Sequence, residues 1–145
     1  MIASALTKTV ARLIFAPTLV IAVAILVKGY ADTGDGFAAG VVAALAVLLQ
    51  YVAFGHEEIE RVLPVRRAPL LGVAGLGLAL AVAFVPVALG KPPMTHWPAP
   101  GASVIHVGTL EILTAVIFDI GVFLLVFGSV VGAIRFLSVL GRSAP

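Results

Sequence analysis

The sequence has no cysteine and few charged residues. The lack of cysteine excludes a disulfide scaffold, a thiolate metal site and a cysteine nucleophile. The three histidines, His56, His96 and His106, do not have the spacing of metal-binding motifs such as HExxH. No serine, histidine and acid arrangement of a hydrolase is evident either. We therefore expect no enzyme, no metal, no cofactor and no nucleic-acid partner.

Apolar residues dominate the chain instead. Hydrophobic residues make up 61% of the 145 positions, charged residues make up 11%, and the mean hydropathy is +1.20. Soluble domains have roughly 45–50% apolar and about 25% charged residues. The chain has too few polar residues to cover the surface of a soluble domain of this size. The composition predicts an integral membrane protein with almost no part outside the bilayer.

Four apolar runs are long enough to cross a membrane, which requires about 20 residues in a helix. We place the spans at residues 12–28, 37–54, 69–89 and 112–136. The runs are continuously apolar, whereas strands of a membrane β-barrel alternate with period two. The sequence thus predicts an all-α protein, with residues 1–145 forming a single four-helix membrane domain.

The first run also has features of a secretory signal peptide. Lys8 and Arg12 precede it, and Gly29-Tyr30-Ala31 is an acceptable cleavage site. We expect the segment to be retained as a span.

The positions of the basic residues predict the orientation, since they accumulate in cytoplasmic loops. Of the nine lysines and arginines, seven fall on one side of the predicted membrane, and Lys28 and Lys91 fall on the other. Both termini are therefore expected in the cytoplasm. The seven residues expected on the cytoplasmic side are Lys8, Arg12, Arg61, Arg66, Arg67, Arg135 and Arg142.

The connections between spans have different compositions. Residues 28–36 are short and rich in glycine, so the first two spans should be adjacent and antiparallel. Residues 55–61 are charged and predict a short interfacial helix that Pro64 ends. Residues 90–108 predict an extended external loop, with Trp97 at the level of the lipid headgroups.

Small residues recur at the spacing that lets membrane helices pack closely. Gly36 and Gly40 have this spacing in the second span, and Gly128 and Gly132 have it in the fourth. The third span carries glycines at 72, 75 and 77. Two interpretations remain open, an internal four-helix bundle and one component of a larger membrane complex.

Asp119 is the one acid deep inside a span, about 7 Å from the middle of the fourth. An intramembrane acid is a candidate for a proton or cation path, or for a structural hydrogen bond to a neighbouring helix. Glu111 lies eight positions earlier at the membrane edge, on nearly the same helical face. It is a candidate for lining an access path to Asp119.

Lys28, Asp32 and Asp35 surround the turn before the second span, where interfacial ion pairing is expected. The turn leads into a helix N-terminus, which suits an anion. However, it has neither a P-loop lysine nor a GxGxxG pattern, and it carries two negative charges, which disfavours a phosphate site.

Two motifs together resemble the MnhB/MrpB family. Residues 34–40, GDGFAAG, are similar to the family pattern P-G-G-G-F-x-[GA]-G after the first span. Residues 118–128, FDIGVFLLVFG, are similar to its pattern F-D-I-G-V-[YF]-L-V-V-x-G in the last span. The order of the motifs and the four-span length also fit. Thr33 and Asp35 replace a proline and a glycine of the pattern, which indicates a divergent branch.

The resemblance implies a small subunit of a multisubunit Mrp-type Na⁺/H⁺ antiporter in a prokaryotic inner membrane. Its partners would be larger antiporter-type membrane subunits, which carry the lysine–glutamate proton relays, together with the lipid bilayer. The transported species of the complex would be a monovalent cation and the proton. This chain has no lysine inside a span, so it would not supply such a relay itself.

The resemblance also suggests roles for the motif residues. We interpret Gly34, Gly36 and Gly40 as a tight turn and a close-packing start for the second span, with Phe37 as an apolar anchor. Gly121, Gly128 and Gly132 are the corresponding packing positions of the last span.

Two alternative functions follow from the same residues. One is the equivalent subunit of a redox-driven ion pump, such as a membrane-bound hydrogenase. The other is a stand-alone small channel or carrier, although the spans hold few of the polar residues that line a self-contained pathway.

Overall fold

The computed structural model describes residues 4–29, 34–97, 106–107, 110–111 and 114–143. Four of its helices are long and apolar enough to span a membrane. They are α1 (Ala5–Lys28), α2 (Gly36–Phe54), α4 (Ala68–Ala88) and α5 (Thr114–Ser143). The connections contain the short helix α3 (His56–Val62), the 3₁₀ turn η1 (Val65–Arg67) and an antiparallel pair of two-residue strands, β1 (His106–Val107) and β2 (Leu110–Glu111). The expectation of four membrane-length helices is confirmed.

Two helix boundaries differ from the sequence-based ones. Helix α1 begins seven residues earlier than residue 12, because Ser4 caps it: its hydroxyl oxygen accepts a hydrogen bond from the Thr7 backbone N–H at 3.1 Å. Helix α5 begins at Thr114, after the β1–β2 hairpin, and extends to Ser143. Hydropathy missed both extensions because polar residues at a helix end lower the average without breaking the helix.

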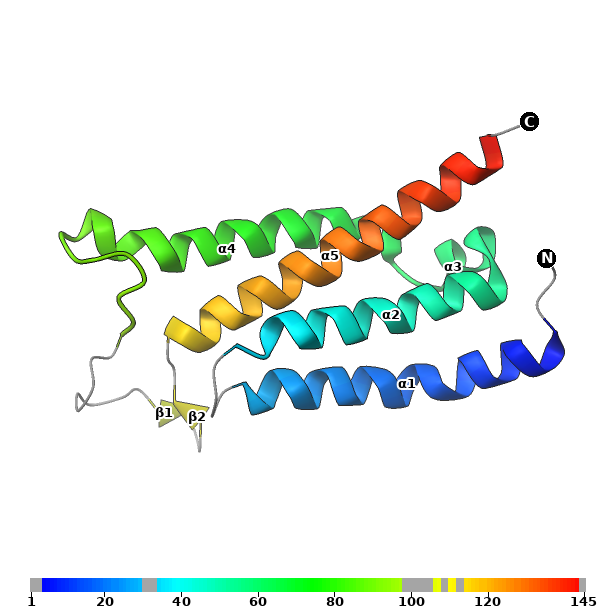
Figure 1. Cartoon of the computed structure of the whole chain (residues 1–145), viewed down its shortest axis with the longest axis horizontal. Coiled ribbons are helices and arrows are strands. Elements are labelled where there is room, and N and C mark those ends of the chain that lie inside the picture. Colours follow the sequence, from blue (N-terminus) through cyan, green and yellow to red (C-terminus); the bar gives the residue numbers. More distant parts are fainter. Residues whose placement is uncertain (1–3, 30–33, 98–105, 108–109, 112–113, 144–145) are drawn as a thin grey trace.

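The four long helices form an open layer with the spatial order α1, α2, α5, α4 (Figure 1). The main contacts join α1 to α2, α2 to α5, and α5 to α4. In the part of the chain that the structure describes, α1 and α4 do not contact each other, so the layer does not close into a bundle. Both termini lie at the same end of the layer, together with α3 (Figure 1).

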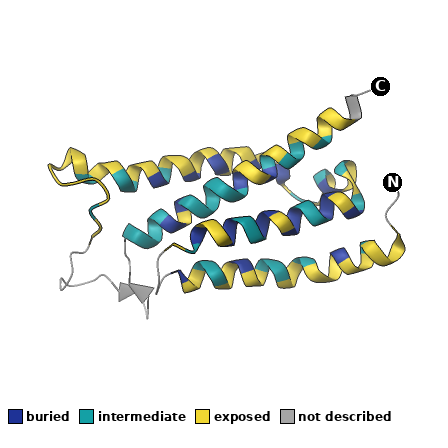
Figure 2. Ribbon diagram, viewed as in Figure 1, coloured by how far each residue is buried: buried dark blue, intermediate teal, exposed yellow. Residues whose placement is uncertain are grey.

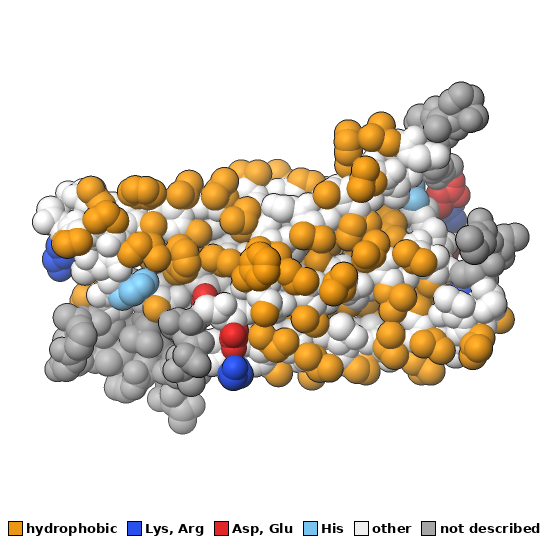
Figure 3. Space-filling model, viewed as in Figure 1, with side chains coloured by type: hydrophobic (Ala, Val, Ile, Leu, Met, Phe, Trp, Pro, Cys, Tyr) orange, Lys and Arg blue, Asp and Glu red, His pale blue; other side chains and the backbone are white. Residues whose placement is uncertain are grey.

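Helix α2 is the interior of this layer, and the surrounding surface is apolar. Half of the residues in the most apolar stretch of α2 are buried, compared with 11–22% of those in the corresponding stretches of the other three spans (Figure 2). Hydrophobic side chains cover the middle of the face seen in Figure 3, and the acidic and basic side chains lie on either side of that band. This distribution is typical of helices that face lipid or other membrane proteins.

Glycines bring the backbones of α4 and α5 into direct contact. A Cβ atom on Gly128 would overlap the backbone nitrogen of Gly72, and one on Gly121 would lie 2.9 Å from a backbone nitrogen of α4. One turn further along α5, a Cβ on Gly132 would lie 3.2 Å from the ring of Pro69. Gly72, Gly121, Gly128 and Gly132 therefore pack helices within this chain, whereas a Cβ on Gly77 would meet nothing within 4 Å.

A buried polar contact joins α1 to α2. The Gln50 side-chain amide donates a hydrogen bond to the Ala11 carbonyl at 2.8 Å, and both residues are buried. A bond in this environment satisfies an amide that would otherwise be buried without a partner. Near the same end of these helices, the Arg12 guanidinium of α1 lies over the Phe54 ring of α2, 5.1 Å from its centroid.

Candidate functional site

Asp119 connects the last span to the glycine turn before α2. Its side chain projects from α5, and the residue is 5% exposed. The Gly34 backbone N–H donates a hydrogen bond of 2.9 Å to its Oδ2 atom. The two sequence motifs, which are far apart along the chain, thus meet at one point of the structure.

Backbone geometry makes glycine necessary around this contact. Gly34 has φ +125°, a conformation that residues with a Cβ rarely adopt. A Cβ on Gly36 would overlap the carbonyl oxygen of Asp119 itself, and one on Gly40 would lie 2.9 Å from the Val126 Cβ. The turn and the first turn of α2 therefore lie directly against α5.

Asp119 lies closer to a helix end than the sequence-based boundaries placed it. Because α5 starts at Thr114, Asp119 is the sixth residue of the helix, about 7 Å along the axis from its first residue. The sequence predicted that Asp119 lies about 7 Å from the middle of a span at residues 112–136, whereas α5 runs from Thr114 to Ser143, so Asp119 lies further from the middle of this helix. Its depth in the bilayer stays a prediction.

Glu111 and Asp119 do not lie on one face of the same helix. It belongs to strand β2, paired with His106, and α5 begins three residues later. The prediction of a shared helical face was wrong because the hairpin, rather than the helix, contains Leu110 and Glu111. The Glu111 side chain lies outside the described residues.

The remaining residues of the turn lie at the surface. The Lys28 ammonium is 3.2 Å from a carboxylate oxygen of Asp35, which is the expected interfacial ion pair. Asp32 lies outside the described part of the chain. Phe37 is 60% exposed, so it points away from this chain rather than into its core.

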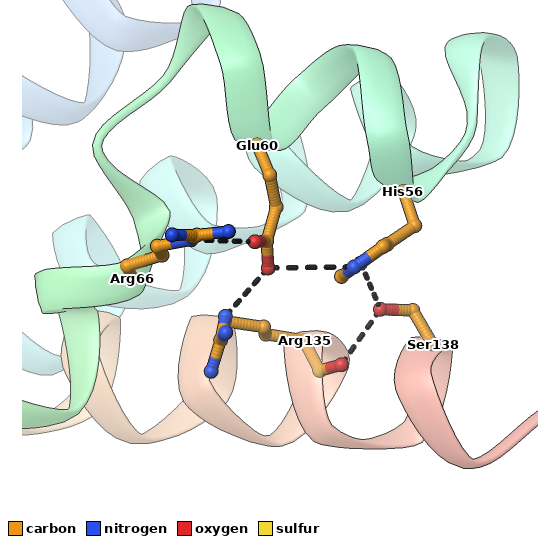
Figure 4. Close-up of polar contacts among 5 residues, drawn as sticks. All are labelled: His56, Glu60, Arg66, Arg135 and Ser138. Atoms are coloured by element: carbon orange, nitrogen blue, oxygen red, sulfur yellow. Dashed lines mark hydrogen bonds and ion pairs between the residues drawn. The ribbon is translucent and has the colours of Figure 1, made fainter.

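A second polar cluster, which was not predicted from the sequence, lies around α3, at the end of the layer that holds both termini (Figure 1). Figure 4 shows its five residues. Glu60 on α3 accepts hydrogen bonds from Arg66 at 2.9 Å and from Arg135 of α5 at 2.5 Å. The Glu60 side chain is 7% exposed. The His56–Glu60 spacing of four residues and the run of arginines were the available signals, but the partner on α5 is 75 positions away.

His56 and Ser138 extend this Glu60 cluster. The Ser138 hydroxyl donates to the Arg135 carbonyl at 2.6 Å, so its oxygen accepts the hydrogen of His56 Nδ1 at 2.9 Å. The other ring nitrogen of His56 is 3.6 Å from Glu60. His56 and Glu60, one helical turn apart on α3, therefore both attach this helix to the C-terminal part of α5.

The charges of the cluster compensate one another. Burial on its own would raise the pKa of Glu60, but the hydrogen bonds from Arg66 and Arg135 outweigh it and hold the pKa below its ordinary value. Glu60 is consequently an ion-pair partner and not a proton carrier near neutral pH. Next to it, the Tyr51 hydroxyl is buried without a hydrogen-bond partner among the described residues.

The contacts of Asp119 and Glu60 hold segments of the chain in place. The described residues contain no group of three or more His, Cys, Asp or Glu side chains that could hold a metal ion. Asp119 contacts a backbone N–H, and Glu60 contacts two guanidinium groups. Each acid joins two segments of the chain that are distant in sequence.

Comparison with known proteins agrees with this architecture. A profile described as a domain related to the MnhB subunit of Na⁺/H⁺ antiporter matches residues 6–132. A Na⁺/H⁺ antiporter subunit of Alkalihalophilus pseudofirmus is 28% identical over 123 residues, which cover 85% of this chain and 84% of that protein. A probable K⁺/H⁺ antiporter subunit of Rhizobium meliloti is 32% identical over 120 residues, 83% of this chain. The matched segment is 12% of that relative's length.

The profile match includes all of α2, α3 and α4 as well as the Asp119 contact with the glycine turn. The resemblance carried by the two motifs therefore extends over most of the sequence. The chain belongs to the family of domains related to the MnhB subunit of Na⁺/H⁺ antiporters.

Proposed function

We propose that the chain is a non-catalytic membrane subunit of a multisubunit monovalent cation/proton antiporter, and that it scaffolds larger antiporter-type subunits. Its relatives are antiporter subunits by name, one for Na⁺ and one for K⁺. In this role residues 1–145 act as a single four-helix membrane domain in a prokaryotic inner membrane, with both termini in the cytoplasm.

The open layer is the observation that carries the proposal. The layer has its edges at α1 and α4, and no other long helix among the described residues covers either of its faces. Many of the exposed side chains on its outer helices are large and apolar; examples are Leu13 (68%) on α1 and Leu70 and Val73 (each 69%) on α4. Such surfaces suit lateral contact with other membrane helices, where close packing supplies the association energy.

Asp119 is proposed as a positioning residue in this scaffold. Its carboxylate already has a partner in the Gly34 backbone, and it lies near the N-terminal end of α5. The contact holds the glycine turn, and with it the first turn of α2, against α5. An ion path through the complex would then belong to the larger subunits.

The test is purification of the tagged chain from its native membrane in mild detergent, followed by mass spectrometry of the proteins that accompany it. Recovery with large antiporter-type membrane subunits would support the proposal. Recovery with iron–sulfur or hydrogenase subunits would assign the chain to a redox-driven pump. Recovery alone or as a homo-oligomer, with cation transport by the chain alone in vesicles, would overturn the scaffold role.

A further inference from the structure

A groove of about 380 Å³ lies at the end of α4, at the end of the layer opposite the two termini (Figure 1). Its volume is within the range of about 300–1,000 Å³ found for small-molecule sites. One wall is formed by apolar side chains of α4, among them Val82 and Val85, and by Leu89, which directly follows the helix. Val85 is 54% exposed and Leu89 70% exposed, so this wall continues into the exposed apolar surface of the chain.

The other wall is a loop that folds back onto α4 and α5. Gly90 reverses the chain with φ +73°, and the Met94 N–H donates to the Ala83 carbonyl at 3.0 Å. The Trp97 N–H donates to the hydroxyl of Thr114, the first residue of α5, at 2.8 Å. The loop is therefore attached at both of its ends, and the groove is formed before any ligand binds.

The mouth of the groove is positively charged and carries an aromatic side chain. Lys91, His96 and Trp97 line it, and none of the lining residues is acidic. Among the described residues, the Lys91 ammonium has no ion-pair partner, whereas Lys28 at the same end of the layer is paired with Asp35. Trp97 is 48% exposed, as is typical of tryptophan at the level of lipid headgroups.

We propose that this groove binds an anionic phospholipid. Its acyl chain would lie along Val82, Val85 and Leu89, and its phosphate would lie against Lys91, with Trp97 at the glycerol level. An apolar wall open to the bilayer fits an acyl chain, and an ammonium group that has no ion-pair partner within the described part of the chain attracts a negative headgroup. A zwitterionic phospholipid would lose most of this attraction, so headgroup charge decides selectivity.

The first experiment is native mass spectrometry of the purified complex that contains the chain, titrated with phosphatidylglycerol or with phosphatidylcholine of the same acyl chains. Lys91→Gln should weaken binding of one phosphatidylglycerol per copy about fivefold and weaken phosphatidylcholine binding less, because the choline ammonium already offsets the attraction between its phosphate and Lys91. The matched control is the double variant Lys28→Gln/Asp35→Asn, which removes an already paired lysine at the same end. It should bind phosphatidylglycerol like the wild type.

A second experiment fills the groove without changing charge. Val85→Trp should lower phosphatidylglycerol binding by a similar factor while the chain still folds, because the Val85 side chain is already 54% exposed. Leu80→Trp, also on α4 and 47% exposed but outside this groove, is the matched control. Equal binding of the two lipids by the wild type, or unchanged phosphatidylglycerol binding by both Lys91→Gln and Val85→Trp, would overturn the proposal.

Discussion

The backbone N–H of Gly34 donates a hydrogen bond to the buried carboxylate of Asp119, 85 positions later in the sequence. This contact gives a hydrogen-bond partner to the acid that is also a candidate for a proton or cation path inside the membrane. It also explains why a glycine turn and an acidic helix motif occur together in one chain. Each motif supplies one half of the same contact.

Substitution of Asp119 separates the two roles. Asp119→Asn keeps an oxygen that can accept the Gly34 hydrogen bond and removes the titratable proton, so assembly and cation-dependent proton transport should stay at wild-type level. Asp119→Ala removes the acceptor and should lower stability by about 1 kcal/mol, measured as the melting temperature and yield of the complex. Loss of transport by Asp119→Asn in a fully assembled complex would show instead that the proton matters.

Gly36 should tolerate no larger side chain. Gly36→Leu would place a Cβ on the Asp119 carbonyl oxygen and push α2 away from α5, at a cost of about 1–3 kcal/mol. We expect fewer assembled complexes with unchanged ion affinity in those that form, measured by size-exclusion yield and by transport per complex. The control is Gly77→Leu, since a Cβ at Gly77 meets nothing within 4 Å. Normal assembly combined with lost transport would contradict this interpretation.

The α4–α5 contact depends on Gly128 in the same manner. Gly128→Ala would overlap the Gly72 backbone and should lower the melting temperature of the purified protein, with a cost of about 1–3 kcal/mol. Gly77→Ala adds the same methyl group to an open position and gains helix propensity, so it should be neutral or stabilising. Similar melting temperatures for the two variants would mean that α4 and α5 pack less closely than described.

Glu60 should make stability depend on pH at the acidic end. The pKa of Glu60 in the folded state lies below the ordinary value of 4.5. Its contribution to the free energy of unfolding is therefore complete above pH 4.5 and is lost as the pH falls through the folded-state pKa. Glu60→Gln should therefore be less stable than the wild type at pH 7, by about 1–3 kcal/mol, and the difference should shrink on acidification. Urea or thermal unfolding in detergent across this pH range measures it.

Glu58 provides the control for the Glu60 experiment. It lies on the same short helix and is exposed. Glu58→Gln should leave both the stability at pH 7 and its pH dependence close to those of the wild type. If Glu60→Gln behaves in the same way, Arg66 and Arg135 do not form a stabilising cluster with Glu60.

The predicted orientation can be tested by single-cysteine labelling, because the chain has no cysteine of its own. Pro92→Cys, in the loop after α4, should react with a membrane-impermeant maleimide from the outside of intact cells. Arg67→Cys, which is exposed at the end with both termini, should react only after the membrane is opened. The reverse pattern would invert the topology and the leaflet in which the Lys91 groove lies.

The features that were predictable from sequence are local ones. Continuous apolar runs predicted the four long helices, and the charged stretch before Pro64 predicted α3. The Lys28–Asp35 pair was also expected, because the two residues flank one short turn. In each case the residues that determine the feature lie within a few positions of one another.

The features that were not predictable depend on residues far apart in the chain. The partner of Asp119 is a backbone N–H, which no side-chain pattern can indicate. The Glu60–Arg135 contact requires knowing that α3 folds back beside α5. The start of α5 was placed two residues too early because Ile112 and Leu113 are apolar and lengthen the apolar run before Thr114.

The spatial order of the layer also constrains how the protein can be made. Helix α5 is synthesised last but lies between α2 and α4, and among the described elements α4 contacts only α5 and the adjoining η1. While the ribosome is still translating residues 114–143, α4 therefore has no helix of its own chain to pack against. A nascent chain interrupted before α5 would leave the α1–α2 pair and an unattached α4 in the bilayer, a form that membrane quality control could recognise and remove.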